Sequence, residues 1–115
     1  MPDVITIRVA APSDAPVLCE LLEQLGYPAA ESEIPPRLAA LASFPGAAAF
    51  VATNGFGEVV GLVTAHLIPS AHDNDPVAWL TTLVVLEDAR EAGIGSALVR
   101  HVERWAAAKL SLIHI

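Results

Sequence analysis

The sequence predicts a single α/β domain, in which helices flank a sheet, on three observations. Short apolar runs alternate as in strands at some positions and recur at helical spacing at others. Of the 115 residues, 54% are hydrophobic and 17% are charged, which supplies one core and is too apolar for a disordered chain. The sequence also contains no repeat, linker or low-complexity tract that would divide it.

A strand and two helices are predicted before residue 46. Residues 4–9 alternate Val and Ile with Thr and Arg, which is the period of a strand. Apolar residues then recur at helical spacing between Ser13, which can cap a helix, and Gly26, which can end one. A shorter helix is expected to begin near Ser32 and to end at Pro45.

A hairpin and a further strand are predicted in the middle of the chain. Residues 48–53 and 58–68 are β-rich, and the turn-forming residues 54–57 join them. Residues 77–86 are apolar on both faces, which is typical of a central strand covered on each side. Alternation along this strand would place Trp79 on the same face as Thr81 and Leu83.

The last long element is an amphipathic helix that begins at about Gly93. Its apolar face consists of Ile94, Ala97, Leu98, Val102 and Trp105. Residues 110–115 alternate again and predict the start of another strand. The same six residues resemble the translation of a transposon-end sequencing adapter, so residues 1–109 are taken as the domain and residues 110–115 as a suspected non-native tail.

Residues 83–98 combine a buried strand, a short connection and a helix opened by glycines. The first N–H groups of a helix have no partner within it, and the helix dipole makes that end positive, so an anion can bind there. Gly93 and Gly95 remove side chains that would hold a diphosphate away. Arg90 adds guanidinium donors and Ser96 a hydroxyl, so the segment predicts a phosphate site.

Other interpretations of the two glycines are open or disfavoured. A tight turn into a helix would by itself explain them, and that interpretation stays open. A P-loop is disfavoured because no Gly-Lys-Ser/Thr is present, and a dinucleotide fingerprint because Leu98 stands at its third glycine. The pattern that remains is Arg-x-x-Gly-x-Gly after a strand that ends Leu-x-Val.

This pattern resembles the Gln/Arg-x-x-Gly-x-Gly/Ala motif of the GNAT N-acetyltransferase family, which Arg90, Gly93 and Gly95 match. The order of strand, helix, helix, hairpin, strand and motif helix is also similar, so the resemblance covers nearly the whole chain. It implies the acyl-CoA N-acyltransferase fold, with a mixed, mostly antiparallel sheet. It also implies acetyl-CoA as co-substrate and direct transfer of the acetyl group to a primary amine of a small molecule or peptide.

The resemblance also implies which residues hold acetyl-CoA. Backbone groups of Leu83 and Val85 would hold the acetyl carbonyl and the pantetheine arm. The cofactor-binding residues implied in this way are Leu83, Val84, Val85, Arg90, Glu91, Ala92, Gly93, Ile94, Gly95 and Ser96. Glu91 departs from the family's small or basic residues and brings a carboxylate towards two phosphates. We therefore expect Glu91→Gly to tighten coenzyme A binding.

The catalytic base departs from the family pattern. Many GNAT enzymes carry a glutamate two positions before the leucine that corresponds to Leu83, and here that position is Thr81. A hydroxyl can orient a water but is too weak a base to ionise near neutral pH. His66 and His72 are alternative bases, because imidazole titrates near working pH. Thr81 and His66 are the candidate catalytic residues, and strand packing stays an open role for both.

Composition and charge restrict the partners and the location. A net charge of −7 argues against nucleic acid as a partner and favours cationic small molecules. If residues 72–75 border the acceptor site, their carboxylates also favour a cationic amine. Neighbouring loop residues lack the spacing of a metal site. The apolar runs are too short to span a membrane, no secretory signal opens the chain, and the single cysteine, Cys19, suits the cytoplasm.

The resemblance finally implies elements that this chain lacks. GNAT domains continue past the motif helix with a strand, a helix that bears a tyrosine acid, and closing strands, and Tyr27 does not match that tyrosine. We therefore expect an incomplete fold whose open sheet edge favours association, for example as a homodimer. A catalytically silent acyl-CoA binding module and an unrelated small α/β interaction domain are the alternative functions.

Overall fold

In the computed structural model, which describes residues 4–69, 71, 76–90 and 93–113, four antiparallel strands form one sheet. The order is β1-β2-β3-β4. The strands are β1 (Thr6–Val9), β2 (Ala47–Thr53), β3 (Val59–Ile68) and β4 (Val77–Val85). β2 and β3 form the hairpin that the sequence predicts, so that prediction is confirmed.

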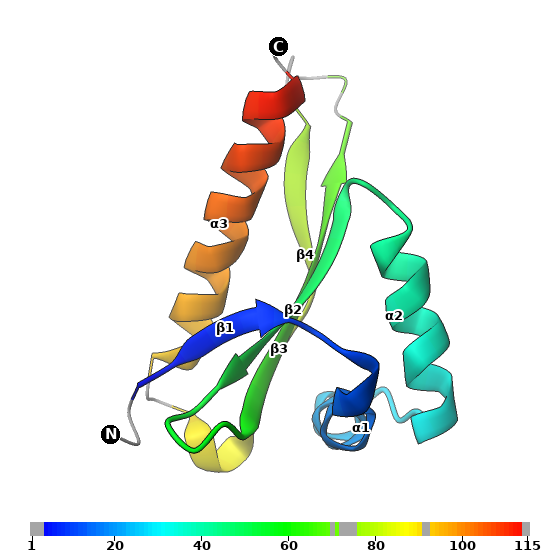
Figure 1. The fold of residues 1–115 in the computed structure, drawn as a ribbon, viewed down its shortest axis with the longest axis vertical. Helices are drawn as coiled ribbons and strands as arrows, with labels where there is room; N and C mark the ends of the chain where they lie inside the picture. Colours follow the sequence, from blue (N-terminus) through cyan, green and yellow to red (C-terminus); the bar gives the residue numbers. More distant parts are fainter. Residues whose placement is uncertain (1–3, 70, 72–75, 91–92, 114–115) are drawn as a thin grey trace.

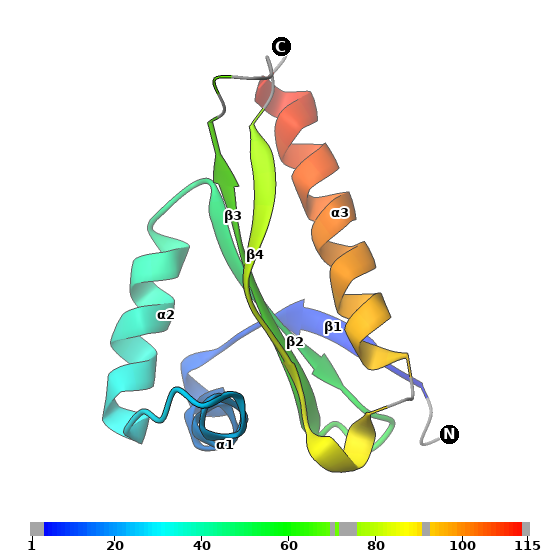
Figure 2. The same cartoon turned by 180° about the vertical axis from the view of Figure 1, so that it is seen from behind.

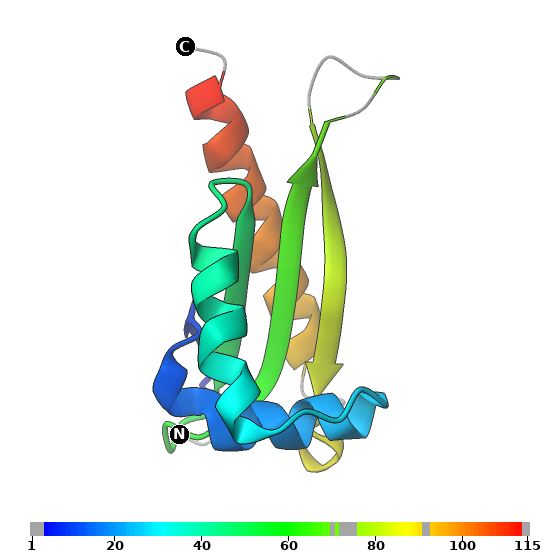
Figure 3. The same ribbon diagram turned by 90° about the vertical axis from the view of Figure 1, so that its right-hand side faces the viewer.

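Helices cover both faces of this sheet. α1 (Ala15–Leu25) and α2 (Ile34–Ala42) lie on one face, and α3 (Ile94–Ile113) lies on the other (Figures 1 and 2). The 3-10 turns η1 (Pro12–Asp14) and η2 (Glu31–Glu33) precede α1 and α2, and η3 (Glu87–Ala89) follows β4. Figure 3 shows α1 running across the end of the sheet at which η3 lies. The predicted fold class is confirmed.

Each face of the sheet has its own apolar core. The buried side chains on the α1 and α2 face are Ala15, Leu18, Leu21, Ile34, Val51, Val59, Leu62 and Val84. Those on the α3 face are Phe50, Ala52, Val60, Val63, Ala65, Ile94, Leu98 and Val102. Leu21 in α1 and Leu98 in α3 are fully buried. Removal of this apolar surface from water stabilises both helix layers.

Gly61 in β3 allows α3 to approach the sheet closely. A Cβ at this position would lie 3.1 Å from Leu98 Cδ1 and 3.2 Å from Ile94 Cγ2. Both neighbours are buried in the first turns of α3, where close packing prevents them from moving aside. The glycine therefore helps to fix the position of the start of α3 on the sheet.

The start of α1 differs from the prediction that Ser13 caps this helix. η1 comes first, so Asp14 occupies the N-cap position, and its carboxylate makes no capping bond to α1. The carboxylate instead accepts the N–H of Ala11 at 2.8 Å and two guanidinium N–H groups of Arg8, each at 2.9 Å. The predicted end of the helix is confirmed, because Gly26 closes α1 in a left-handed conformation with φ of +99°.

β4 is an edge strand, so the prediction of a central strand is wrong, and the expected cover on each face is present only near Val84 and Val85. The exposed fractions of Trp79, Leu80 and Leu83 are 57%, 41% and 38%. The strand is apolar on both faces, but no other strand of the described residues pairs with its outer edge. The expectation that the chain associates depends on this open edge.

α3 continues to Ile113, so the prediction of a strand at residues 110–115 is wrong for residues 110–113. Residues 114 and 115 lie outside the described residues. A helix that has already formed extends at low cost, since each further residue gains a backbone hydrogen bond, and this overrides a short alternating pattern. None of the helices in the described part of the chain is long and apolar enough to cross a membrane.

Candidate functional site

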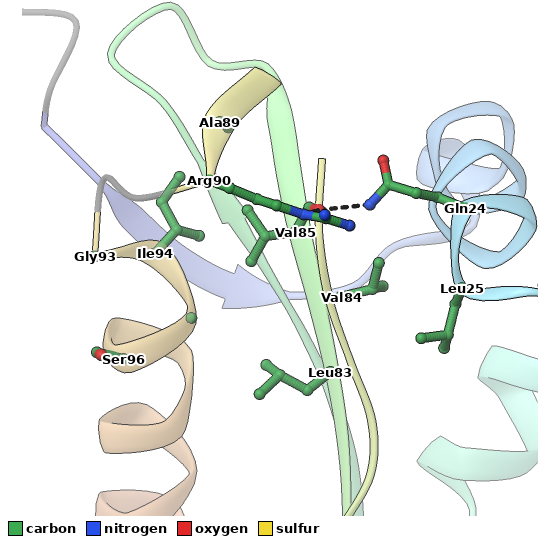
Figure 4. A pocket seen from close by; sticks show the side chains of 11 residues that line it. Gln24, Leu25, Leu83, Val84, Val85, Ala89, Arg90, Gly93, Ile94 and Ser96 are labelled. Carbon is green, nitrogen blue, oxygen red and sulfur yellow. Dashed lines mark hydrogen bonds between the residues drawn. The ribbon is translucent and has the colours of Figure 1, made fainter. Parts of the chain in front are cut away.

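A pocket of about 430 Å³ lies at the carboxyl end of β4, between the start of α3 and the end of α1 (Figure 4). Its lining residues are Gln24, Leu25, Leu83, Val84, Val85, Ala89, Arg90, Gly93, Ile94, Gly95 and Ser96. The side chain of Leu83 points towards α3 and that of Val84 towards α1, so the pocket spans the open edge of β4. All predicted cofactor-binding residues line it except Glu91 and Ala92, which lie outside the described residues.

The first turn of α3 brings backbone donors to this pocket. The N–H of Ala97 donates to the carbonyl oxygen of Gly93 at 3.0 Å, and the N–H groups of residues 94–96 precede this bond and have no partner within the helix. Gly93 has φ of +76°, a conformation that favours glycine. A Cβ at Gly95 would meet nothing closer than Val85 Cγ2 at 4.0 Å, so the missing side chain leaves open space. This arrangement suits an anion such as a diphosphate.

Arg90 places a guanidinium group across this pocket. Its side chain extends from the end of η3 towards Gln24 (Figure 4). The Nε of Arg90 donates to the carbonyl oxygen of Val85 at 3.3 Å. This bond is long and the side chain is exposed, so the guanidinium can turn towards a bound anion at little cost.

Gln24 is a residue of this pocket that the sequence analysis missed. Its Nε2 donates to the carbonyl oxygen of Val85 at 2.6 Å, and its Oε1 accepts the N–H of Glu87 at 3.0 Å. The helical pattern of α1 shows that Gln24 belongs to the helix but gives no sign of these contacts. The partners are more than sixty residues away in the chain, so only the tertiary fold brings them together.

The structure also brings the two predicted catalytic residues together. The Oγ1 of Thr81 lies 3.1 Å from Nδ1 of His66 and 2.7 Å from Oγ1 of Thr64. The Thr81 hydroxyl also donates to the carbonyl oxygen of Thr64 at 3.3 Å. Thr64 is the residue that the sequence analysis missed here, because its neighbours depend on the register between β3 and β4. The three side chains form a polar cluster on the α1 and α2 face of the sheet.

A β-bulge accounts for this cluster. The register between β3 and β4 shifts by one residue, so Thr81 is the extra residue of β4. A bulge reverses the alternation of side chains beyond it, and Leu83 therefore lies on the face opposite to Trp79. The prediction that Trp79, Thr81 and Leu83 share one face is wrong for Leu83, because a strict period of two assumes an unbroken strand.

Tyr27 and Cys19, which the sequence also singled out, do not line this pocket. Tyr27 follows α1 and has an exposed fraction of 71%. His72 and the rest of residues 72–75 lie outside the described residues. Cys19 packs against the core, and burial raises the pKa of its thiol, which disfavours the reactive thiolate. Within the described residues, no group of three or more His, Cys, Asp and Glu side chains is placed to hold a metal ion.

The fold and the pocket define an α/β domain in which a helix N-terminus opens beside an edge strand. Among protein families, the model of the acetyltransferase (GNAT) family matches residues 16–115. The chain belongs to the GNAT acetyltransferase family, so the resemblance inferred from the motif is confirmed. A search of curated proteins gives no match.

Solved structures support the same fold. A GNAT family acetyltransferase from Staphylococcus aureus is 21% identical, with a TM-score of 0.80, over 92% of this chain and 80% of that one. A protein of Agrobacterium tumefaciens described as an acetyltransferase is 31% identical, with a TM-score of 0.76, over 90% of this chain and 74% of that one. AAC(6')-Iy, in complex with the bisubstrate analogue CoA-S-monomethyl-acetylneamine, is 22% identical, with a TM-score of 0.75, over 92% of this chain and 74% of that one.

Proposed function

We propose that this protein is an N-acetyltransferase that transfers the acetyl group of acetyl-CoA directly to a primary amine of a small molecule or peptide. Membership of the GNAT family supports acetyl transfer. The observation that carries the proposal is the pocket at Gly93 and Gly95, where backbone donors and Arg90 surround open space. Such a site suits the diphosphate of coenzyme A.

The carbonyl oxygen of Val85 exchanges a partner when acetyl-CoA binds. It already accepts Gln24 Nε2 at 2.6 Å and Arg90 Nε at 3.3 Å, which uses both of its lone pairs. Arg90 makes the longer bond, and a guanidinium binds a diphosphate strongly. Arg90 therefore turns to the phosphates, and Val85 accepts an amide N–H of the pantetheine arm in its place.

The reaction forms one C–N bond and breaks one C–S bond. The amine gives a proton to a base, its nitrogen attacks the thioester carbonyl carbon, and the coenzyme A thiolate leaves and takes up a proton. Backbone N–H groups on the open edge of β4 near Leu83 stabilise the oxyanion of the transition state.

His66 is the proposed base and Thr81 orients it. When the Thr81 hydroxyl donates to Thr64, its oxygen is free to accept the Nδ1–H of His66. This assignment of the ring proton leaves Nε2 as the nitrogen that takes the proton of the amine.

Coenzyme A binding to a pocket variant tests the proposal. In Gly95→Leu, the new side chain fills the space beside Val85, and leucine is a good helix former. We expect calorimetry to show at least about a tenfold loss of coenzyme A affinity without a loss of thermal stability. Ala107→Leu makes a comparable change at an exposed position of α3 and should bind coenzyme A normally. Equal affinity in all three proteins would overturn the proposal.

A second candidate function is a catalytically silent acyl-CoA binding module. The hydroxyl of Thr81 at the position of the family's glutamate favours it, because a hydroxyl is a weak base. Thiol release from acetyl-CoA, measured with a panel of primary amines, separates the two candidates. A protein that binds coenzyme A but releases no thiol with any amine is the silent module.

Two further expectations belong to the same proposal. The net charge of −7 draws a protonated amine towards the protein, and the single cysteine supports a cytoplasmic location. The open edge of β4 supports association into a homodimer.

A further inference from the structure

A second pocket, of about 460 Å³, lies where the end of β3 meets the chain between α2 and β2. Phe44, Ala47, Ile68 and Pro69 contribute apolar lining to this pocket, and His66 and Thr81 contribute the polar groups. Its volume falls within the range of small-ligand sites. The polar cluster of His66, Thr81 and Thr64 therefore borders an apolar space.

β4 connects this pocket with the pocket at Gly93 and Gly95, which is proposed to bind coenzyme A and is called the coenzyme A pocket below. Thr81 lines the apolar pocket and Leu83 lines the other, and the two residues are two positions apart on one strand. Because Thr81 is the extra residue of the bulge, this separation is at most about 7 Å, the value that the usual rise of a strand gives. A molecule beside Thr81 thus lies close to the edge of β4 along which the thioester would be held.

The lining of the apolar pocket carries no carboxylate among the described residues. Each charge of a polyamine or aminosugar placed against this lining would lose water without gaining an opposite charge from it, which is costly. One amine can be accommodated, because it meets His66 and Thr81, while an apolar body covers Phe44 and Ile68. The lining that the structure describes thus favours one amine on an apolar group over a polycation.

We propose that this pocket receives the acceptor, and that the acceptor is a primary amine attached to a compact apolar body such as a hydrocarbon ring. The inference rests on the proposed acetyltransferase function and names the substrate class of that site. The negative net charge attracts the ammonium group to the protein, and the apolar lining selects the group that carries it.

Binding of two probe amines tests the inference without acyl transfer. Phenethylamine carries one amine on a short chain attached to an aromatic ring, and spermidine carries three amines on a flexible chain. We expect NMR titration of the whole chain to show phenethylamine binding at least about tenfold more tightly than spermidine, with the shifts at His66 and Thr81. Equal binding, tighter binding of spermidine, or shifts elsewhere would overturn the inference.

Variants at partly exposed positions localise the site without unfolding the chain. Ile68→Asp puts a carboxylate in the pocket. We expect this variant to bind phenethylamine about tenfold more weakly than the wild type and to prefer spermidine instead. Phe44→Ala, at a position with an exposed fraction of 65%, removes an aromatic contact and should weaken the binding of phenethylamine several-fold. Leu80→Asp is the matched control, because Leu80 is about as exposed as Ile68 and lies on the other face.

The outcomes separate this inference from the proposed function. If coenzyme A binds and phenethylamine does not, the acceptor class is wrong and the acetyltransferase proposal stands. If phenethylamine binds at the pocket and coenzyme A does not, the proposed function fails. A loss in Leu80→Asp equal to that in Ile68→Asp would place the amine outside the pocket and overturn the inference.

Discussion

The side-chain amide of Gln24 in α1 donates to the carbonyl oxygen of Val85, the last residue of β4, at 2.6 Å. The same amide accepts the N–H of Glu87 at the start of η3, at 3.0 Å. One side chain thus bonds the chain on both sides of the corner between β4 and η3. This corner leads to Arg90, so α1 holds in place the segment that is proposed to bind diphosphate.

Gln24→Leu should weaken both the fold and coenzyme A binding. It removes two hydrogen bonds and leaves the polar groups of Val85 and Glu87 without these partners, which costs about 1–3 kcal/mol of unfolding free energy. We expect denaturant unfolding to show this loss and calorimetry to show weaker coenzyme A binding. Glu23→Leu changes the exposed neighbour on α1 and should leave both unchanged.

Gln24→Glu distinguishes a positioning role from simple packing. Its carboxylate can accept the N–H of Glu87 but cannot donate to Val85, and it adds negative charge beside the proposed phosphate site. Affinity for coenzyme A should fall further than in Gln24→Leu, and the extra loss should shrink at high salt. Normal affinity in both variants would mean that the corner is held by other contacts.

The contrast between Gly93 and Gln24 shows what the sequence could predict about the site. The pattern of Arg90, Gly93 and Gly95 is local, because a strand, a turn and a helix start suffice to bring these residues to one pocket. Gln24 and Thr64 meet their partners only through α1 packing and strand register, which no local pattern encodes.

The errors in the predicted fold have a similar cause. An apolar pattern on both faces of β4 reports which surfaces favour burial, but it does not say whether a neighbouring strand is present to cover the edge. A single extra residue at Thr81 changes which face Leu83 occupies, and strand alternation alone cannot reveal a bulge. The hairpin and the end of α1 at Gly26 were predictable because turn and helix-end residues are themselves the signal.

Gly61→Ala should destabilise the protein and displace the start of α3. The added methyl group would lie 3.1 Å from Leu98 and 3.2 Å from Ile94, which are both buried. Overpacking of this kind costs about 1–3 kcal/mol. Denaturant unfolding measures the loss, and coenzyme A affinity should fall with it because α3 forms one wall of the pocket.

Gly46→Ala is the control for this substitution. A Cβ at Gly46 would meet Leu67 at 3.5 Å, which is an ordinary contact. The stability of Gly46→Ala should therefore stay near that of the wild type. If Gly61→Ala were as stable as Gly46→Ala, the close approach of α3 to β3 would not be needed for folding.

Asp14 should make the stability of the fold depend on pH in acid. The hydrogen bonds from Arg8, together with the N–H of Ala11, hold the pKa of the Asp14 carboxyl below its usual value. A lowered pKa in the folded state stabilises the protein fully above the ordinary carboxyl pKa of about 4, and this contribution is lost as the pH falls through the folded value.

Asp14→Asn removes the charge and tests this pH dependence. At neutral pH the variant should be less stable than the wild type by about 1–3 kcal/mol, because a buried charged hydrogen bond is lost. The difference should shrink as the pH falls below about 4, since the wild type then loses the same charge. Urea unfolding at several pH values measures this difference in unfolding free energy, and Glu23→Gln is the control because it changes an exposed carboxylate. A difference that stays constant down to acid pH would contradict the role of the ion pair.

His66→Gln should lower kcat for acetyl transfer by about 10²–10⁴-fold without changing coenzyme A affinity, if His66 is the base. The histidine lies with Thr81 in the polar cluster, whereas the pocket proposed to bind coenzyme A is lined by other residues. Loss of the base should also remove the rise of kcat with pH that a general base produces.

Thr81→Val separates orientation of the base from the base itself. Valine keeps the shape and β-propensity of threonine but cannot accept the Nδ1–H of His66, so kcat should fall less than in His66→Gln and the pH dependence should persist. Stopped-flow measurement of thiol release across pH gives both quantities, and coenzyme A calorimetry confirms that the cofactor site is intact. A pH profile that is unchanged in His66→Gln would exclude His66 as the base, because removal of the general base must change the pH dependence of kcat.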